Sequence, residues 1–181
     1  FCFSAKIVSD EGVVRERGGY LKKSLLKMDA EFRQHWKNYV LQSILAAVAL
    51  FIVLYFLSMQ HAVIIASLGA TAFIVFAMPA NITAQARNVI GGHIVGLSCG
   101  FLFSLIPHPS LLSSLMVYSL AVGASIFIMV VTDTEHPPAS GTALGVAMTG
   151  ITLNVLIIVI VSVIIFAVIH RMCKPYLKDL T

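Results

Sequence analysis

The charged residues in the long apolar part of this chain are few and confined to two short segments. Between Tyr39 and His170 the only formally charged side chains are those of Arg87, Asp133 and Glu135. A charge placed within a bilayer costs roughly 3 kcal/mol on insertion scales, so such residues are usually kept for an ion or substrate pathway. The pattern therefore favours a small transporter or channel.

The first segment, residues 78–93, reads MPANITAQARNVIGGH. Pro79 is expected to end one helix and Asn88 to cap the next, which places Arg87 beside a helix N-terminus. The free N–H groups and the positive dipole end at that point attract anions. A guanidinium adds a planar pair of donors suited to an oxyanion. The candidate substrate-binding residues of this segment are Arg87, Asn88, Gly91, Gly92 and His93.

Two of these residues also have structural interpretations that the sequence leaves open. Arg87 would serve equally well as a cytoplasmic topology anchor. His93, one turn into its helix, is predicted either to gate or carry protons or to be a buried histidine with satisfied hydrogen bonds.

The second segment, residues 132–145, reads TDTEHPPASGTALG. Proline is well suited to the first turn of a helix, so His136, Pro137 and Pro138 are expected at a helix mouth and are assigned to substrate binding. The charge of His136 would respond to pH there. Asp133 and Glu135 are predicted to gate or couple transport by pairing with Arg87 or His136.

Glycine recurs at every fourth position in both halves of the chain. The positions are Gly92, Gly96 and Gly100, followed by Gly141 and Gly145. This spacing lets a helix approach a neighbour closely, which favours tight helix packing. A backbone that lines a pathway is the alternative interpretation.

The composition indicates an integral membrane protein with an all-α fold. Hydrophobic residues make up 59% of the 181 positions and charged residues 11%, outside the range of ordinary soluble domains. A spanning helix needs about 20 apolar residues. Uncharged stretches occur at 39–58, 61–79, 89–107, 111–132 and 151–169, with a shorter one at 138–150. Because these runs are apolar on all sides, they predict about six hydrophobic helices and not barrel strands.

The shortest stretch, 138–150, would be only about 20 Å long as a helix. It is therefore expected to be a half-helix, or to belong to a helix that breaks near Gly150. An internal repeat relates the two halves: GATAFIVFA (69–77) matches GASIFIMVV (123–131) at an offset of 54 residues. An offset that contains two crossings predicts parallel repeats, with chance similarity of two apolar helices as the alternative.

The basic residues flank the apolar region and do not form a patch for nucleic acid. Eight of the twelve lysines and arginines precede Tyr39 and three follow His170. The positive-inside rule therefore places both termini in the cytoplasm, and a bacterial-type inner (plasma) membrane is expected. The predicted organisation is a polar segment with an interfacial amphipathic helix (1–37), a transmembrane domain (38–172) and a basic tail (173–181).

The motif RNVIGGH, followed by EHPPA and with GA-containing helices before each, resembles the HPP family of small integral membrane proteins. The resemblance covers roughly residues 36–171. Family members in cyanobacteria and plastids are associated with nitrite transport, so the resemblance implies a small-anion transporter or channel. Members commonly read SPLAQPRN where this chain reads ANITAQARN. Ala86 thus replaces a proline, and the loop is expected to be less rigid.

The sequence therefore predicts a channel or proton-linked transporter for a small monovalent oxyanion, with nitrite as the leading candidate. The protein is expected to form a homo-oligomer in the bilayer and to need no cofactor. A regulatory or assembly subunit without transport is one alternative. A metal-dependent enzyme built on His93, Asp133, Glu135 and His136 is another, but no HExxH spacing or nucleophile elbow supports an enzyme.

Overall fold

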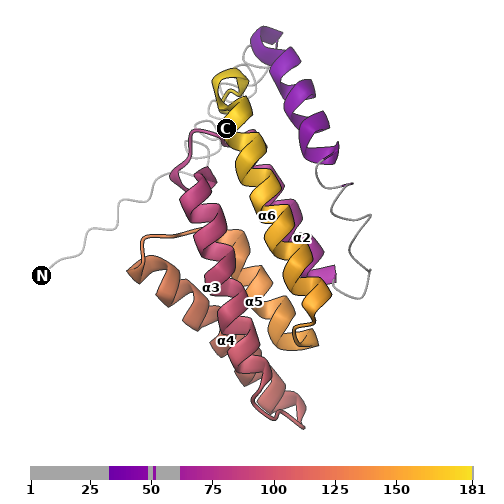
Figure 1. The fold of residues 1–181 in the computed structure, drawn as a ribbon, viewed down its shortest axis with the longest axis vertical. Coiled ribbons are helices and arrows are strands. Elements are labelled where there is room, and N and C mark those ends of the chain that lie inside the picture. The colour runs from indigo at the N-terminus through magenta and orange to yellow at the C-terminus, as the bar shows by residue number, and fades with distance from the viewer. Residues whose placement is uncertain (1–32, 49–50, 52–61, 181) are drawn as a thin grey trace, which may run out of the picture. The chain divides into compact units, whose positions relative to one another are not determined.

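The computed structural model describes residues 33–48, 51 and 62–180, and every regular element in these ranges is a helix (Figure 1). The predicted all-α class is confirmed for this part of the chain. The chain divides into two compact units, Phe1–Tyr39 and Val40–Thr181. The amphipathic helix predicted before residue 37 lies largely outside the described residues, as does part of the stretch 39–58.

The second unit contains five α-helices after residue 61, joined by short connections. They are α2 (Ala62–Ala77), α3 (Ala86–Ser104), α4 (Leu111–Val131), α5 (Pro137–Thr149) and α6 (Leu153–Cys173), with 3₁₀ turns η2 (Ile82–Ala84) and η3 (Lys174–Tyr176). Local signals set several ends. Ser110 begins α4 with a reciprocal capping box, and the Thr152 side chain accepts from the Val155 N–H at the start of α6.

Within the described residues, the segments Leu111–Val131 and Leu153–Tyr176 are long and apolar enough to cross a membrane. By contrast, α5 has only 13 residues, about 20 Å of helix. It ends at Gly150, whose φ of 73° is a left-handed conformation that glycine adopts readily. The break predicted at this glycine is therefore present.

Helices α2 and α6 share much of the apolar core. The rings of Phe76 and Phe166 meet edge to face with centroids 6.4 Å apart, and both residues are fully buried in a cluster that includes Leu68 and Val159. The C-terminal end of α6 also contacts the segment that follows α2. The His170 Nε2 donates to the Pro79 carbonyl at 3.0 Å.

The two helices that follow the candidate segments, α3 and α5, run parallel and pack closely. Gly92 lies against His136, Gly96 against Ala139 and Gly100 against Ala143, so the residue numbers rise together along both helices. A Cβ atom at Gly96 would run into the backbone carbonyl of Ala139. These glycines thus allow the two helices to pack closely, as the first interpretation of their spacing predicted.

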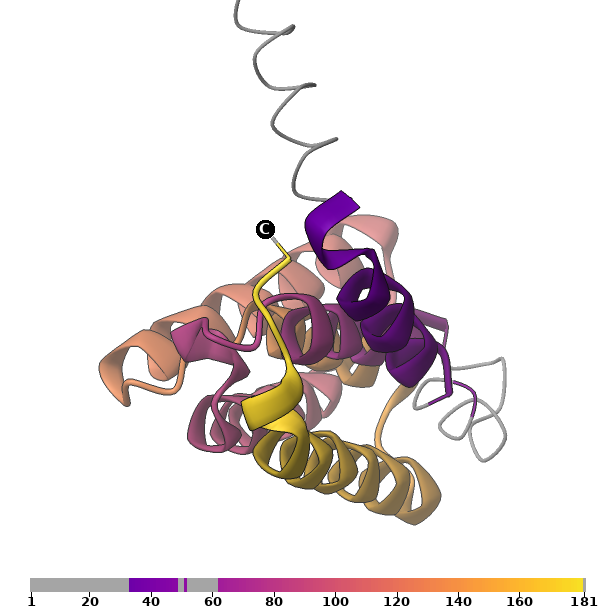
Figure 2. The same cartoon turned by 90° about the horizontal axis from the view of Figure 1, so that it is seen from above.

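The outer helix α4 contacts both α3 and α5, but its C-terminal end stands out from the other helices in both views (Figures 1 and 2). The turn at residues 132–136 then leads back to α5. The parallel course of α3 and α5 agrees with the proposed repeat, whereas their lengths of 19 and 13 residues differ. The internal repeat stays a prediction.

Candidate functional site

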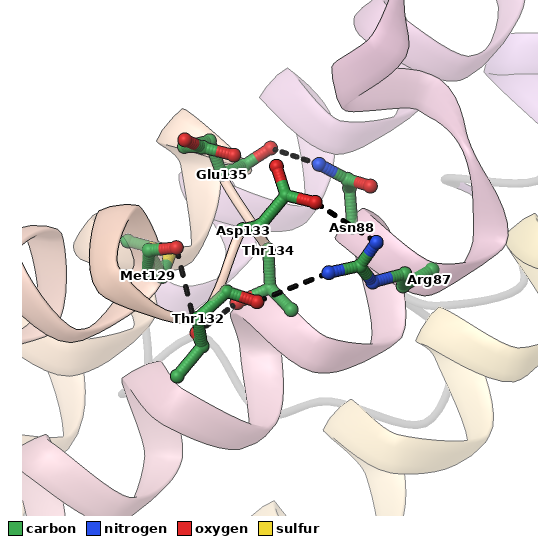
Figure 3. A network of polar contacts seen from close by, with 7 residues as sticks. All are labelled: Arg87, Asn88, Met129, Thr132, Asp133, Thr134 and Glu135. Atoms are coloured by element: carbon green, nitrogen blue, oxygen red, sulfur yellow. Dashed lines mark hydrogen bonds and ion pairs between the residues drawn. The ribbon is translucent and has the colours of Figure 1, made fainter.

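The outer part of the candidate site is an ion pair between the two segments. Arg87, the second residue of α3, places its Nη1 2.9 Å from Asp133 Oδ2, and its Nη2 donates to the Thr132 carbonyl at 3.1 Å. Figure 3 shows the guanidinium reaching across to this turn. The two side chains are 61% and 66% exposed. Because exposed pairs contribute only about 0–1 kcal/mol, a solvent anion can compete for this arginine.

Asp133 occupies an unusual backbone conformation, with a φ of 53°. The turn around it is held by the Thr134 N–H, which donates to the Met129 carbonyl at 2.9 Å. A 2.8 Å contact between the hydroxyls of Thr132 and Thr134 also holds it (Figure 3). Asp tolerates the left-handed region better than most residues. The turn therefore fixes the carboxylate opposite Arg87.

Asn88 does not cap α3, so that prediction was wrong. The helix begins at Ala86, with Gln85 at the cap position and no side-chain cap bond. The reason is the preceding 3₁₀ turn, after which Gln85 is extended (φ −65°, ψ 145°) and takes the cap position three residues before Asn88. Asn88 is instead buried, and its Nδ2 donates to the Glu135 carbonyl at 3.1 Å.

The inner part of the site is a pair of buried histidines that share one hydroxyl. The rings of His93 and His136 lie 5.2 Å apart between centroids, and each Nε2 contacts Thr71 Oγ1, at 2.9 and 3.0 Å. His136 Nδ1 donates to the Thr83 carbonyl at 2.8 Å. His93 Nδ1 contacts Thr142 Oγ1 at 2.9 Å.

The chain of polar contacts continues from Thr142 into α2. Thr142 Oγ1 lies 2.8 Å from Ser67 Oγ, which donates to the Pro138 carbonyl in a short hydrogen bond. We call the five side chains of His136, Thr71, His93, Thr142 and Ser67 the hydroxyl–imidazole chain. All five are buried. Its three hydroxyl residues were not predicted from the sequence, although Ser67 and Thr71 stand four positions apart in an otherwise apolar helix.

His136 therefore differs from the open helix mouth that the sequence predicted. It is fully buried and both of its ring nitrogens are engaged. In this loop position between α4 and α5, burial lowers the pKa of His136 to about 4, although the hydrogen bond to the Thr83 carbonyl acts in the opposite direction. His136 is consequently neutral at physiological pH in this state.

The N-termini of α3 and α5 lie side by side because the two helices are parallel. Neither Gln85 nor His136, the two cap residues, supplies a side-chain cap bond. The positive ends of two helix dipoles thus act on the same place. Pro137 and Pro138 have no N–H. An anion at this place is therefore attracted by the helix dipole of α5, whereas α3 also offers backbone N–H donors.

A cavity of about 270 Å³ lies between α4 and α5 and has His136 in its wall. Its lining is almost entirely apolar and comes from Ile126, Met129, Val130, Glu135, His136, Pro137 and Ser140. Gly91, another predicted site residue, lies against Thr134 instead. Within residues 33–48, 51 and 62–180, no three His, Cys, Asp or Glu side chains gather as a metal site would require.

Comparison with known proteins finds a family whose model matches most of this chain. A family model described as the transmembrane region of HPP matches residues 31–176. A protein from Dictyostelium discoideum, described as a transmembrane protein, is 35% identical over 88 residues, which make up 49% of this chain and 31% of the relative. The chain thus spans less than a third of that relative's length. No solved structure matches the chain.

Proposed function

The chain belongs to the HPP family of transmembrane proteins, and on that premise we propose that it carries a small monovalent oxyanion, with nitrite as the leading candidate, across the membrane. The proposal rests on what the two polar segments offer chemically. A nucleotide or sugar would need a larger polar surface than these segments hold. A small planar anion needs only one fork of donors and a positive field.

The observation that carries the proposal is the position of Arg87. It is the only basic side chain with a permanent charge between Tyr39 and His170, and it stands at the adjoining N-termini of α3 and α5. Its partner Asp133 is an exposed carboxylate on a turn. An incoming oxyanion presents the same pair of acceptor atoms as that carboxylate. Exchange of one for the other would open the pair at little cost.

Behind the ion pair, the buried part of the site offers the anion a second position. His136 lies in the wall of the 270 Å³ cavity, whose apolar surroundings strengthen any attraction between an anion and a protonated imidazole. In this proposal Arg87 and Asp133 form the entry, and His136 with the N-terminus of α5 forms the inner binding position.

We assign the entry to the cytoplasmic side of an inner (plasma) membrane, because the Lys- and Arg-rich ends of the chain favour that side. The connections before α3 and α5 lie at the same end of two parallel helices. Both connections are therefore assigned to the same side of the membrane. A bundle with one short helix encloses little volume, which supports assembly as a homo-oligomer.

Nitrite flux into liposomes that contain only this protein tests the proposal. We expect flux above that of protein-free liposomes, loss of that flux in Arg87→Ala, and partial recovery in Arg87→Lys, because an ammonium replaces a planar fork. Arg171→Ala, which removes an exposed basic residue at the end of α6, is the matched control and should leave flux unchanged. Flux into protein-free liposomes also measures how much nitrous acid crosses the bilayer without the protein.

Two results would contradict the proposal. Wild-type flux equal to that of protein-free liposomes would favour a regulatory or assembly subunit. Unchanged flux in Arg87→Ala, at equal protein level, would make Arg87 a topology anchor.

A further inference from the structure

We infer that the hydroxyl–imidazole chain is a binding site for one shared proton, and that Thr71 passes this proton between His136 and His93. This inference deepens the proposed function, on which its role in transport rests, because it names the ion that accompanies the anion. It gives Ser67, Thr71 and Thr142 a role in binding the proton, although none of them contacts the Arg87 ion pair.

The inference follows from a count of hydrogen atoms. The five side chains are joined end to end between two backbone carbonyls, Thr83 O and Pro138 O, by six contacts. Each contact needs one hydrogen, and a carbonyl supplies none. Three hydroxyls and two neutral imidazoles supply one hydrogen each, five in total. The neutral chain is therefore one hydrogen short, and a single added proton completes all six contacts.

A seventh contact competes for the hydroxyl hydrogen of Thr71, so the count of six applies when that hydrogen points to an imidazole. Thr71 Oγ1 also lies 3.1 Å from the carbonyl of Ser67, four residues earlier in α2. Serine and threonine commonly make such a contact within a helix. The same carbonyl already lies in the backbone ladder of α2, so the hydroxyl hydrogen of Thr71 is free to turn toward either imidazole.

The added proton has two alternative positions. With the charge on His136, its Nε2–H donates to Thr71 Oγ1, and the Thr71 hydroxyl donates to His93 Nε2. When the proton leaves His136 Nε2 for Thr71 Oγ1, the hydroxyl proton of Thr71 leaves for His93 Nε2. The charge is then on His93. The other four contacts keep their hydrogens, so the transfer needs no rearrangement elsewhere.

The hydrogen-bond partners of both imidazoles are neutral, so the added proton has no fixed counter-charge among the residues that the structure describes. The helices packed around the chain carry these ionisable groups: none on α2 or α5, Tyr118 on α4, Arg87 and Cys99 on α3, and His170, Arg171 and Cys173 on α6. The connecting turn adds Asp133 and Glu135. Asp133 pairs with Arg87 and His170 donates to Pro79 O. An unpaired buried charge is strongly disfavoured, so the proton should load together with an anion at His136.

Nuclear magnetic resonance of ¹⁵N-histidine-labelled protein in lipid nanodiscs tests the proton site without any transport. On acidification we expect His93 and His136 to take up one proton in a single common step. Thr71→Val should abolish the common step, and Thr71→Ser should restore it. His108, on the exposed turn before α4, lies outside the hydroxyl–imidazole chain and is the internal reference for the resonances of all variants. Independent titration of His93 and His136 in the wild-type protein, or the absence of any proton uptake by them, would overturn the inference.

Added nitrite separates this inference from the proposed function. We expect nitrite to move the common step to higher pH, and proteoliposomes to take up about one proton per nitrite. Thr71→Val should lower this ratio toward zero. Ser125→Ala is the matched control, because Ser125 is buried but donates only within its own helix, to Val122 O. A common step that nitrite does not move would reject nitrite as the substrate and leave the shared proton supported. A ratio of one that persists in Thr71→Val would reject the relay through Thr71.

Discussion

Replacement of Gly96 by alanine should destabilise the membrane domain, because α3 and α5 approach most closely at this residue. The new Cβ atom would run into the carbonyl oxygen of Ala139. A flexible side chain can rotate away from such a collision, whereas a backbone carbonyl in a helix cannot. The two helices must therefore separate.

The expected change in the free energy of unfolding of Gly96→Ala follows from two opposing effects. Overpacking of a close interface costs about 1–3 kcal/mol, and the rigid backbone obstacle places Gly96→Ala at the upper end. Removal of a helical glycine returns about 1 kcal/mol. The net loss is then about 2 kcal/mol. Gly123→Ala is the control, because a Cβ there meets nothing within 4 Å, so it should gain up to about 1 kcal/mol.

Reversible unfolding of both variants in mixed micelles measures this difference, which should be about 3 kcal/mol by the same estimates. The separation would also pull His93, three residues before Gly96, away from Thr142. The histidine resonances of the Gly96→Ala protein should therefore shift while those of Gly123→Ala should not. Equal stability of the two variants would show that α3 and α5 do not pack in this register.

Three further predictions concern the entry. Ala86→Pro should stabilise the protein by about 0.4–1 kcal/mol in thermal unfolding, because Ala86 is the first residue of α3 and Gln85 before it is already extended; a loss of stability would contradict the described start of α3. Asp133→Asn should lower the KM for nitrite by releasing Arg87, while Asn still accepts the left-handed backbone; a higher KM would mean that Asp133 helps to bind the substrate. Cysteines at Gln85 or Thr132, in a chain without other cysteines, should resist a membrane-impermeant thiol reagent in intact cells, and labelling of either from outside would overturn the cytoplasmic assignment.

Much of the helical framework could be predicted because its signals are local. Proline marked the end of α2 and the start of α5, and Gly150 marked the end of α5. The parallel course of the two glycine-bearing helices agrees with the predicted parallel repeats, and the internal repeat itself stays a prediction. The pairing of Arg87 with Asp133 was among those considered, since few charges were available to pair.

The inner site could not be predicted because its partners are distant in sequence and ordinary in type. Ser67 and Thr142 are 75 positions apart, and a single serine or threonine in an apolar helix is common. For His93 the sequence left two interpretations, and the structure shows a buried ring with both nitrogens engaged. Asn88 was misassigned because a 3₁₀ turn, not its own side chain, sets the start of α3.

The short length of α5 bears on how the membrane domain is synthesised and inserted. With 13 residues, α5 falls well below the roughly 20 that a helix needs to be stable in lipid alone. It must therefore enter the bilayer against a surface that α2 and α3 have already formed. Until it does, Thr71 lacks its contact with His136 and His93 lacks its contact with Thr142. A nascent chain that stalls before residue 137 would therefore lack the contacts that α5 and its cap make with these two polar groups.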